Sequence, residues 1–238
     1  METHTGIAKK KRDDDEFRTA QVVIAGLRAQ ADAGEMVLAY FDEVGFSQVH
    51  PNRSAWTRKG GRHLIDAKRG KRLNVLAAML STGGLFSAKI WQSTTADIFA
   101  GFIGLLKEHV GKKITVILDN ASIHKAKGIQ HIIEFLEKQG VTLYFLPAYS
   151  PELNRIEKLW HLMKYTWMSV RCRDSKNLEV DVDEILDNFG TKYKSGWVYS
   201  PPLWGALPSG EAEASRRAPG PTDTPPLWGG EPSFQILR

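Results

Sequence analysis

Five short apolar runs along the chain alternate with stretches in which apolar residues recur at helical spacing, and no other feature constrains the fold as strongly. The runs that predict strands are residues 37–42, 73–80, 85–92, 114–118 and 141–146. The stretches that predict helices are residues 17–33, a segment that follows Thr94 or Thr95, and residues 125–139 and 151–168. A glycine-containing turn at 82–84 joins two of the runs and predicts an antiparallel hairpin. This order predicts an α/β fold in which helices cover the faces of a mixed sheet.

The length and charge of the chain set broad limits on its class. Its 238 residues are enough for one sizeable domain with appendages, and its net charge of +5 is a mild indication of a polyanionic partner. Its one cysteine, Cys172, excludes internal disulfides and cysteine-based metal sites and fits a reducing cytoplasm. No apolar run approaches the roughly 18 residues of a membrane-spanning helix, and the charged N-terminus is not a secretory signal. We therefore expect a cytoplasmic protein with no membrane partner.

The composition divides the chain into three parts. Residues 1–34 hold a charge block and the first helix, and residues 35–195 hold all the predicted strands and form the expected globular domain. Residues 196–238 contain eight of the eleven prolines and two copies of Pro-Pro-Leu-Trp-Gly. A segment of this kind cannot bury enough apolar surface to offset its ordering entropy, so we expect a disordered tail. A proline-rich docking tail is the alternative.

Three acidic residues lie where apolar runs end or a helix begins. Asp42 closes the first run, Asp119 follows the fourth, and Glu157 lies in the first turns of the helix after Ser150. Ligands of α/β folds bind in the crevice at the carboxyl ends of the strands. Carboxylates that meet there repel one another unless a cation intervenes, and hard oxygen ligands suit Mg²⁺ or Mn²⁺. The pattern favours a metal-dependent enzyme that cuts or joins phosphodiesters.

Each of these acids also has a simpler explanation. Asp119 could only cap a turn, and Glu157 could only favour the helix dipole, as Glu152 does. Glu43 competes with Asp42, because neighbouring residues of a strand point to opposite faces and only one of them can join the site. The spacing alone does not decide between the two.

Two sequence strings and one tripeptide help to decide between the functional and the simpler explanations of these acids. The strings are Leu-Asp-Asn-Ala-Ser-Ile-His at 118–124 and Ser-Pro-Glu-Leu-Asn-Arg-Ile-Glu-Lys-Leu-Trp at 150–160, and the tripeptide is Phe-Asp-Glu at 41–43. Together they closely resemble the DDE transposases of bacterial insertion sequences, in the insertion-sequence six-thirty group of the mariner-like superfamily. The resemblance extends over residues 17–194.

This resemblance implies a ribonuclease H-like fold with a mixed five-stranded sheet. It assigns Asp42, Asp119 and Glu157 as the catalytic, metal-binding triad, with two Mg²⁺ ions, or Mn²⁺ in their place. It also implies cleavage and strand transfer that move an insertion sequence, usually into TA sites. The implied partners are double-stranded DNA, both element ends and target, and a second copy of the chain in the active assembly. The implied location is the bacterial cytoplasm, in association with the nucleoid.

The basic stretch between the first two apolar runs is the predicted DNA contact, with a solvated hairpin extension as the alternative. Its residues are Arg53, Trp56, Arg58, Lys59, Arg62, Lys68, Arg69, Lys71 and Arg72. His124 is a further candidate, which could contact a phosphate or the attacking group or could only cap the following helix. Asn154 is expected to shape the turn before Glu157. Trp160 is expected in the core, with stacking on a base as the alternative.

One departure from the family leaves the activity open. The resemblance implies helix-turn-helix modules before the catalytic domain, and the residues before the first apolar run contain no such pair of helices. We therefore expect a truncated copy, one half of a split reading frame, or a fragment. The alternatives to an active transposase domain are an inactive remnant that binds DNA without turnover and a general ribonuclease H-like nuclease.

Overall fold

The structure is a computed structural model, and it describes residues 12–49, 70–194 and 235–237 of the chain. Six strands form one sheet in the order β5-β4-β1-β2-β3-β6. They are β1 (Val37–Ser47), β2 (Arg72–Leu80), β3 (Leu85–Ile90), β4 (Ile114–Leu118), β5 (Val141–Phe145) and β6 (Gln235–Leu237). Strands β1, β4 and β5 run parallel, whereas β2, β3 and β6 pair antiparallel with their neighbours. The predicted mixed sheet of five strands is therefore confirmed, and β6 adds a short edge strand.

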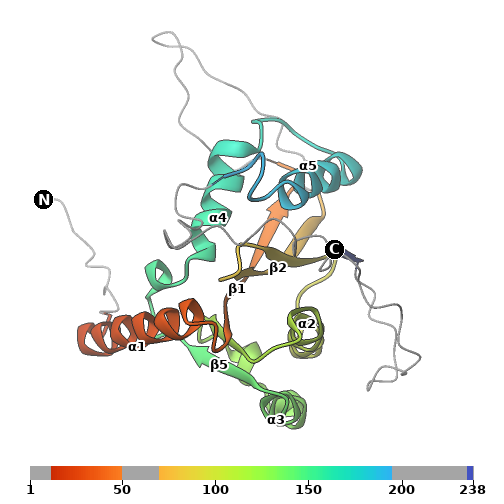
Figure 1. Ribbon diagram of the computed structural model, residues 1–238. Coiled ribbons are helices and arrows are strands. Elements are labelled where there is room, and N and C mark those ends of the chain that lie inside the picture. The colour runs from red at the N-terminus through yellow and green to blue at the C-terminus, as the bar shows by residue number, and fades with distance from the viewer. Residues whose placement is uncertain (1–11, 50–69, 195–234, 238) are drawn as a thin grey trace, which may run out of the picture.

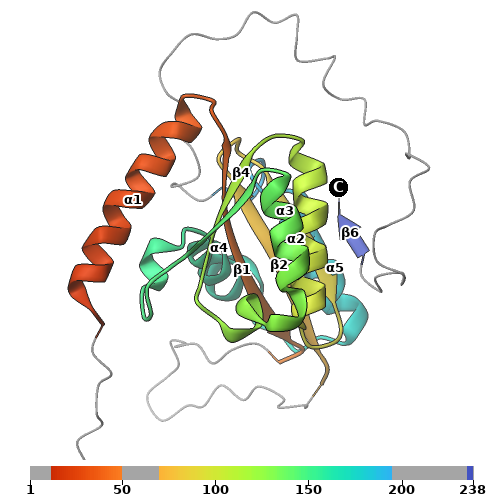
Figure 2. The same ribbon diagram turned by 90° about the horizontal axis from the view of Figure 1, so that it is seen from below.

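The two faces of the sheet are covered by different helices (Figures 1 and 2). The helices are α1 (Asp14–Asp32), α2 (Ala96–Val110), α3 (Gln130–Lys138), α4 (Ile156–Leu162) and α5 (Ser175–Asp187). Residues Leu38 and Tyr40 of β1 pack with α1, α4 and α5, whereas Ala39 and Phe41 pack with α2 and α3. This alternation follows from the two-residue period of a strand, and it produces one apolar core on each face.

Short polar side chains and glycines set the ends of the helices. The carboxylate of Asp13 accepts hydrogen bonds from two backbone N–H groups at the start of α1, and Thr95 and Asp174 cap α2 and α5 in the same way. Gly111 ends α2 with a φ of 66°, a left-handed conformation that glycine adopts without strain. The prediction that a threonine begins the second helix is confirmed.

Two predicted helices begin later than expected. Residues 125–139 were expected to form one helix, but two 3₁₀ turns precede α3. Residues 151–168 divide into a 3₁₀ turn, the helix α4 and a π-helical turn, Met163–Trp167. The interruption lies at Asn154, whose backbone is extended and whose side chain bonds to another element. Helix α5 was not predicted.

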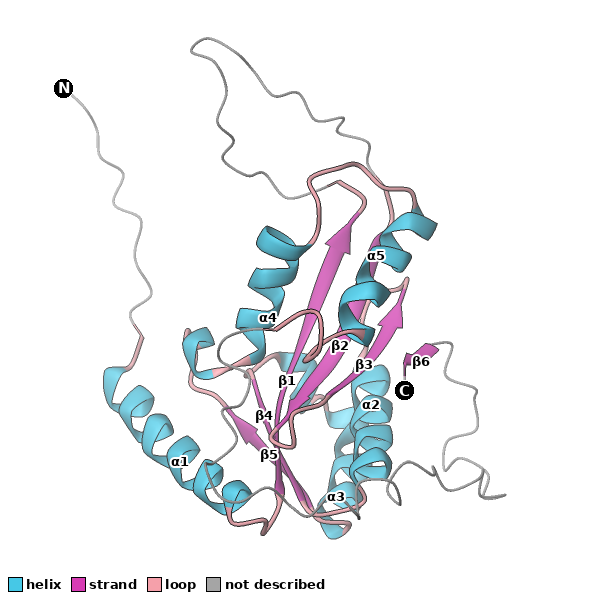
Figure 3. Ribbon diagram, turned by 45° about the horizontal axis from the view of Figure 1, so that its top comes forward, coloured by secondary structure: helices cyan, strands magenta, loops and turns pink. Residues whose placement is uncertain are grey.

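The segment 196–238 departs from the expectation at one point. Residues 235–237 form β6, which pairs antiparallel with Ser87, Ala88 and Lys89 of β3 (Figure 3). The remaining residues of that segment lie outside the described part of the chain.

Candidate active site

Asp42 lies in the middle of β1, so the prediction that it ends its strand is wrong. The strand continues to Ser47 because β2 pairs with it over the whole length, including Asp42 with Ala77. The carboxylate of Asp42 faces α4, where Trp160 Nε1 donates a hydrogen bond to Asp42 Oδ2 at 3.0 Å. Strand alternation directs Glu43 to the opposite face. Of the two neighbouring acids, the geometry therefore turns Asp42 toward the helix that carries Glu157.

Asp119 directly follows β4, as predicted, and a buried histidine holds its carboxylate. The Oδ1 atom accepts a hydrogen bond from the backbone N–H of Ala121 at 3.2 Å and lies 3.0 Å from His124 Nδ1. The His124 ring packs against the rings of Phe99 and Phe41, with centroids 4.4 and 5.7 Å away. Only 7% of His124 is exposed, and this burial does not favour the predicted contact with DNA. Its contact is with a candidate metal ligand instead.

Glu157 lies in the first turn of α4, and the residues before it tie the helix to β1. Asn154 Nδ2 donates a hydrogen bond to the carbonyl oxygen of Phe41 at 2.9 Å, and the Asn154 carbonyl accepts the N–H of Glu157 at 3.2 Å. Asn154 therefore shapes the start of the helix, as expected. It also fixes that start to the residue that precedes Asp42.

An open pocket of about 340 Å³ brings Asp119 and Glu157 to one surface. The loop between β5 and α4 forms much of its wall. The lining residues are Asp119, Asn120, Ala121, Leu146, Pro147, Ala148, Tyr149, Ser150, Pro151, Asn154 and Glu157. Two segments that are distant in the sequence, residues 119–121 and 146–157, thus meet at one hollow, with two of the three predicted acids in its wall.

The three carboxylates differ in their pKa values. Burial first, and then the charge of Glu157, raise the pKa of Asp42 to about 7. Burial also raises the pKa of Glu157, and the charge of Asp119 adds to that effect. The hydrogen bond from His124 lowers the pKa of Asp119. In the absence of a cation, Asp119 is therefore the most readily ionised of the three carboxylates, and Asp42 stays protonated up to nearly neutral pH.

Lys164 is a candidate site residue that the sequence analysis missed. It is half-buried in the π-helical turn, and burial first, then the charge of Arg72, lower its pKa, while Glu157 and Asp42 oppose that shift. Its position seven residues after Glu157 is two helical turns, which puts both residues on one face. This seven-residue spacing is the sequence feature from which Lys164 could have been predicted as a site residue. A cation here can face the phosphate of a substrate that the carboxylates alone would repel.

The donor set fits a divalent cation in kind. Hard carboxylate oxygens are the ligands that Mg²⁺ and Mn²⁺ prefer, and the charges of Glu157 and Asp119 add to the burial that raises the pKa of Asp42. Among the described residues, no three acidic, histidine or cysteine side chains already stand close enough to enclose an ion. Ionised carboxylates repel one another, so a bound cation would be needed to draw the three acids closer.

Most of the predicted DNA contacts cannot be placed. Arg53, Trp56, Arg58, Lys59, Arg62, Lys68 and Arg69 lie outside the described residues. Lys71 and Arg72 are exposed at the start of β2. The guanidinium of Arg72 lies so close to Gly45 that a Cβ atom there would clash with it. Trp160 is 3% exposed, which confirms its place in the core and leaves no face for a base.

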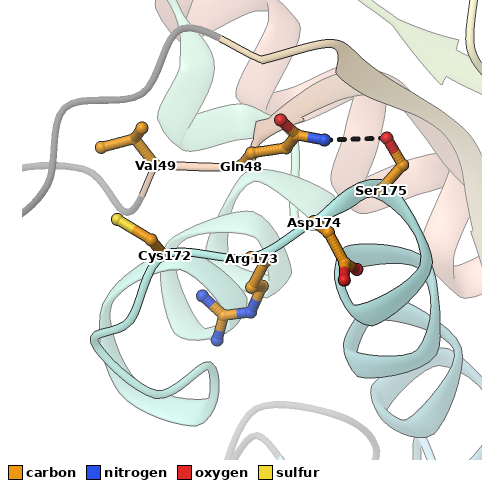
Figure 4. A pocket seen from close by; sticks show the side chains of 6 residues that line it. All are labelled: Gln48, Val49, Cys172, Arg173, Asp174 and Ser175. Atoms are coloured by element: carbon orange, nitrogen blue, oxygen red, sulfur yellow. Dashed lines mark hydrogen bonds between the residues drawn. The ribbon is translucent and has the colours of Figure 1, made fainter.

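A second pocket, of about 400 Å³, lies where β1 ends (Figure 4). Its walls come from Gln48 and Val49 and from the segment 172–175, and Gln48 Nε2 donates a hydrogen bond to Ser175 Oγ at 2.8 Å. Arg173 is already paired with Asp181 at 2.5 Å. The polar groups of this pocket thus join β1 to the start of α5 and include none of the three predicted acids.

No helix within the described residues is both long enough and apolar enough to span a membrane.

Comparison with protein families and curated proteins gives three matches. A family model described as DDE superfamily endonuclease matches residues 37–179. The chain is 27% identical over 138 residues to an uncharacterized 39 kDa protein of insertion element IS630 from Shigella sonnei, which is 56% of this chain and 39% of that protein. It is 36% identical over 61 residues to the uncharacterized protein y4pE/y4sA of Sinorhizobium fredii, 26% of this chain and 41% of that protein. The matches span about two fifths of the length of these relatives.

Comparison with solved structures identifies the same fold in transposases. The Mos1 transposase paired-end complex with the left transposon end superposes with a TM-score of 0.55 at 16% identity, over 80% of this chain and 61% of that one. The Mos1 mariner paired-end complexes with Mn and with Mg give TM-scores of 0.56 and 0.55 at 15% identity, with the same coverage. This likeness shows that the chain has the ribonuclease H-like fold of these proteins.

Proposed function

Because the chain belongs to the DDE superfamily of endonucleases, we propose that it cleaves and joins DNA strands as the catalytic domain of an insertion-sequence transposase. The predicted resemblance to the transposases of the IS630 and mariner group is confirmed by the family match and by the curated and structural relatives. One structural observation supports the proposed catalytic role in addition to membership of the superfamily. Asp42, Asp119 and Glu157 are scattered over 115 positions of the sequence, yet Asp119 and Glu157 line one pocket, and the charges of these two add to the burial that raises the pKa of Asp42.

In this proposal the carboxylates of Asp42, Asp119 and Glu157 would hold two divalent ions. Mg²⁺ and Mn²⁺ are the candidates, and the Mos1 complexes named for these two metals support that choice. When bound, such ions activate the attacking oxygen and stabilise the leaving oxygen of a phosphodiester. The protein's own part is to fix the ligands: Trp160 holds one oxygen of Asp42, and His124 holds Asp119.

The substrate in this proposal is double-stranded DNA at the ends of an insertion sequence, followed by a target at TA dinucleotides. The first reaction is hydrolysis of a phosphodiester, which frees a 3′-hydroxyl. In the second, that hydroxyl attacks a phosphodiester of the target strand, a new P–O bond forms, and the target's own 3′-oxygen leaves as the old P–O bond breaks. Lys164 lies close enough to Arg72, Glu157 and Asp42 to interact with their charges, and the two cations would offset the charge of the acids toward an approaching phosphate. The names of the Mos1 complexes, which describe a paired transposon end and strand transfer, support DNA as the partner. A pair of copies as the active form is a further part of the proposal.

A cleavage assay with point variants tests the proposal. Purified protein is incubated with Mg²⁺ and a labelled duplex that carries the element's end, and nicks are resolved on a denaturing gel. Asp42→Asn, Asp119→Asn and Glu157→Gln are each expected to lower cleavage by at least about 100-fold, because each removes a metal ligand. Glu43→Gln is the matched control on the opposite face of β1, and it should cleave as the wild type does.

The same assay separates the alternatives. Wild-type protein that binds the duplex but never nicks it, in Mg²⁺ or Mn²⁺, would be the inactive remnant. Cleavage of an RNA–DNA hybrid in preference to the DNA duplex would identify a ribonuclease H-like nuclease.

A further inference from the structure

Tyr149 holds a backbone conformation that its side chain disfavours. Its φ is 58°, and it is the one residue other than glycine with a positive φ in the described parts of the chain. An aromatic residue in this left-handed region is strained, and such strain persists only where the surrounding structure imposes it. Tyr149 therefore occupies a position that glycine would fill at lower cost.

The segments on both sides of Tyr149 are firmly held. The N–H of Leu146 donates to the carbonyl oxygen of Leu118 at 2.9 Å, next to Asp119. Ser150 is 3% exposed, and its carbonyl oxygen accepts the N–H of Leu153 at 3.1 Å. The loop thus presents Tyr149 from fixed points at the edges of the same pocket that Asp119 and Glu157 line.

This strained residue is largely exposed and is not part of the apolar cores. Tyr149 is 56% exposed and belongs to neither of the two apolar cores within the described residues. The loop around it is apolar, with Leu146, Pro147 and Ala148 in the pocket wall. A large flat ring at the rim of a hollow, with strain and without burial, is suited to contact a ligand rather than the protein.

We propose that Tyr149 is a nucleobase-binding residue, which stacks on an unpaired base of the DNA strand beside the phosphate at the carboxylates. This inference rests on the proposed function. The acids in the pocket repel the DNA backbone, whereas the face of a base carries no charge and stacks on an aromatic ring whatever its identity. Tyr149 thus supplies attraction at the point where phosphate contacts are least favourable. It also fixes the strand relative to the pocket.

The test compares Tyr149→Gly with Tyr149→Phe and measures thermal stability and DNA affinity for each. If the ring contacts the ligand, Tyr149→Gly should lose affinity without losing stability. Glycine relieves the positive φ, so Tyr149→Gly should unfold at the same temperature as the wild type or higher. Its affinity for a duplex with a short single-stranded end, measured by fluorescence anisotropy, should fall roughly 5- to 150-fold. Tyr149→Phe keeps the ring and should bind as the wild type does. Phe135→Ala, which removes another exposed ring on α3, is the control and should bind normally.

An abasic scan links the ring to a base. One abasic nucleotide, at the position that Tyr149 contacts, should weaken binding by the wild type as much as Tyr149→Gly does, and should weaken the variant little further. Tyr149→Gly that binds every oligonucleotide as tightly as the wild type would overturn the inference and leave the proposed function intact. A Tyr149→Gly variant that loses thermal stability and shows additive losses in the scan would overturn it as well. Wild-type protein that neither binds nor cleaves DNA would overturn both proposals.

Discussion

Asp42→Asn should stabilise the metal-free protein at neutral pH, although it removes a residue of the candidate active site. The pKa of Asp42 is raised to about 7 by burial and by the charge of Glu157, so the ionised form is costly in the folded state. Asparagine has the same shape and no charge. Its side-chain oxygen can still accept the hydrogen bond from Trp160.

The size of the effect follows from the pKa. A rise from 3.8 to about 7 corresponds to about 4 kcal/mol of unfolding free energy, at about 1.4 kcal/mol per pKa unit. We take this as an upper limit, because water and side-chain relaxation reduce the cost of a buried charge. A gain of about 2 kcal/mol corresponds to a rise of roughly 4–8 °C in thermal midpoint for a domain of this size.

The pH dependence has a definite sign. Between about pH 4 and 7 the folded protein keeps a proton on Asp42 that the unfolded chain has released, so this group makes the wild type less stable as the pH rises. The advantage of Asp42→Asn should therefore be absent near pH 4, grow through this window and level off above about pH 7.

Thermal unfolding by circular dichroism at pH 4, 5, 6, 7 and 8, in EDTA and in Mg²⁺, provides the assay. In EDTA the thermal midpoint of the variant should exceed that of the wild type, as described. Addition of Mg²⁺ should raise the midpoint of the wild type and not that of the variant, because only the wild type retains the full ligand set. An Asp42→Asn protein that melts below the wild type in EDTA at pH 8 would refute the reasoning, since it would show that the carboxylate is stabilised in the folded state without metal.

Three further predictions concern other parts of the molecule. Lys89→Ala should lower the unfolding free energy by roughly 1–3 kcal/mol in urea titrations, because the buried ammonium pairs with two carboxylates of α5 at 2.9 and 2.6 Å; an unchanged midpoint would show that these pairs contribute nothing. Arg72→Ala should weaken DNA binding and reduce the slope of log affinity against log salt by about 0.9; a constant slope would mean that Arg72 contacts no phosphate. Deletion of residues 196–238 should shift the thermal midpoint by no more than about 2 °C, since three residues pair with β3; a larger drop would give the tail a structural role.

The sequence predicts best the elements that local pattern alone determines. Strand β4 matches its predicted range, Ile114–Leu118, because five consecutive buried residues, four of them apolar, between two parallel strands leave no other assignment. The cap at Thr95 is equally local. Helix α5 carried a readable stripe, with Leu178, Val182 and Ile185 on one face, and the charged residues among them obscured it.

The parts of the site that sequence reasoning missed depend on contacts between distant segments. The second half of β1 alternates polar and apolar residues and is a strand only because β2 pairs with it, so Asp42 became a mid-strand residue. His124 is buried by Phe99 on α2, a contact that no spacing within its own string indicates. The bond from Asn154 to the carbonyl of Phe41 likewise joins residues 113 positions apart.

The distribution of the three acids along the chain has a consequence during protein synthesis. Strand β1, with Asp42, leaves the ribosome first, but its partner β4 and the glutamate of α4 come much later, and Asp42 and Glu157 are 115 positions apart. At roughly 5–20 residues per second, the nascent chain exists for about 6–23 s with its acids unassembled. On the proposed function, the chain could not cut nearby DNA before α4 has been made. Any message truncated before α4 encodes a protein without the complete triad.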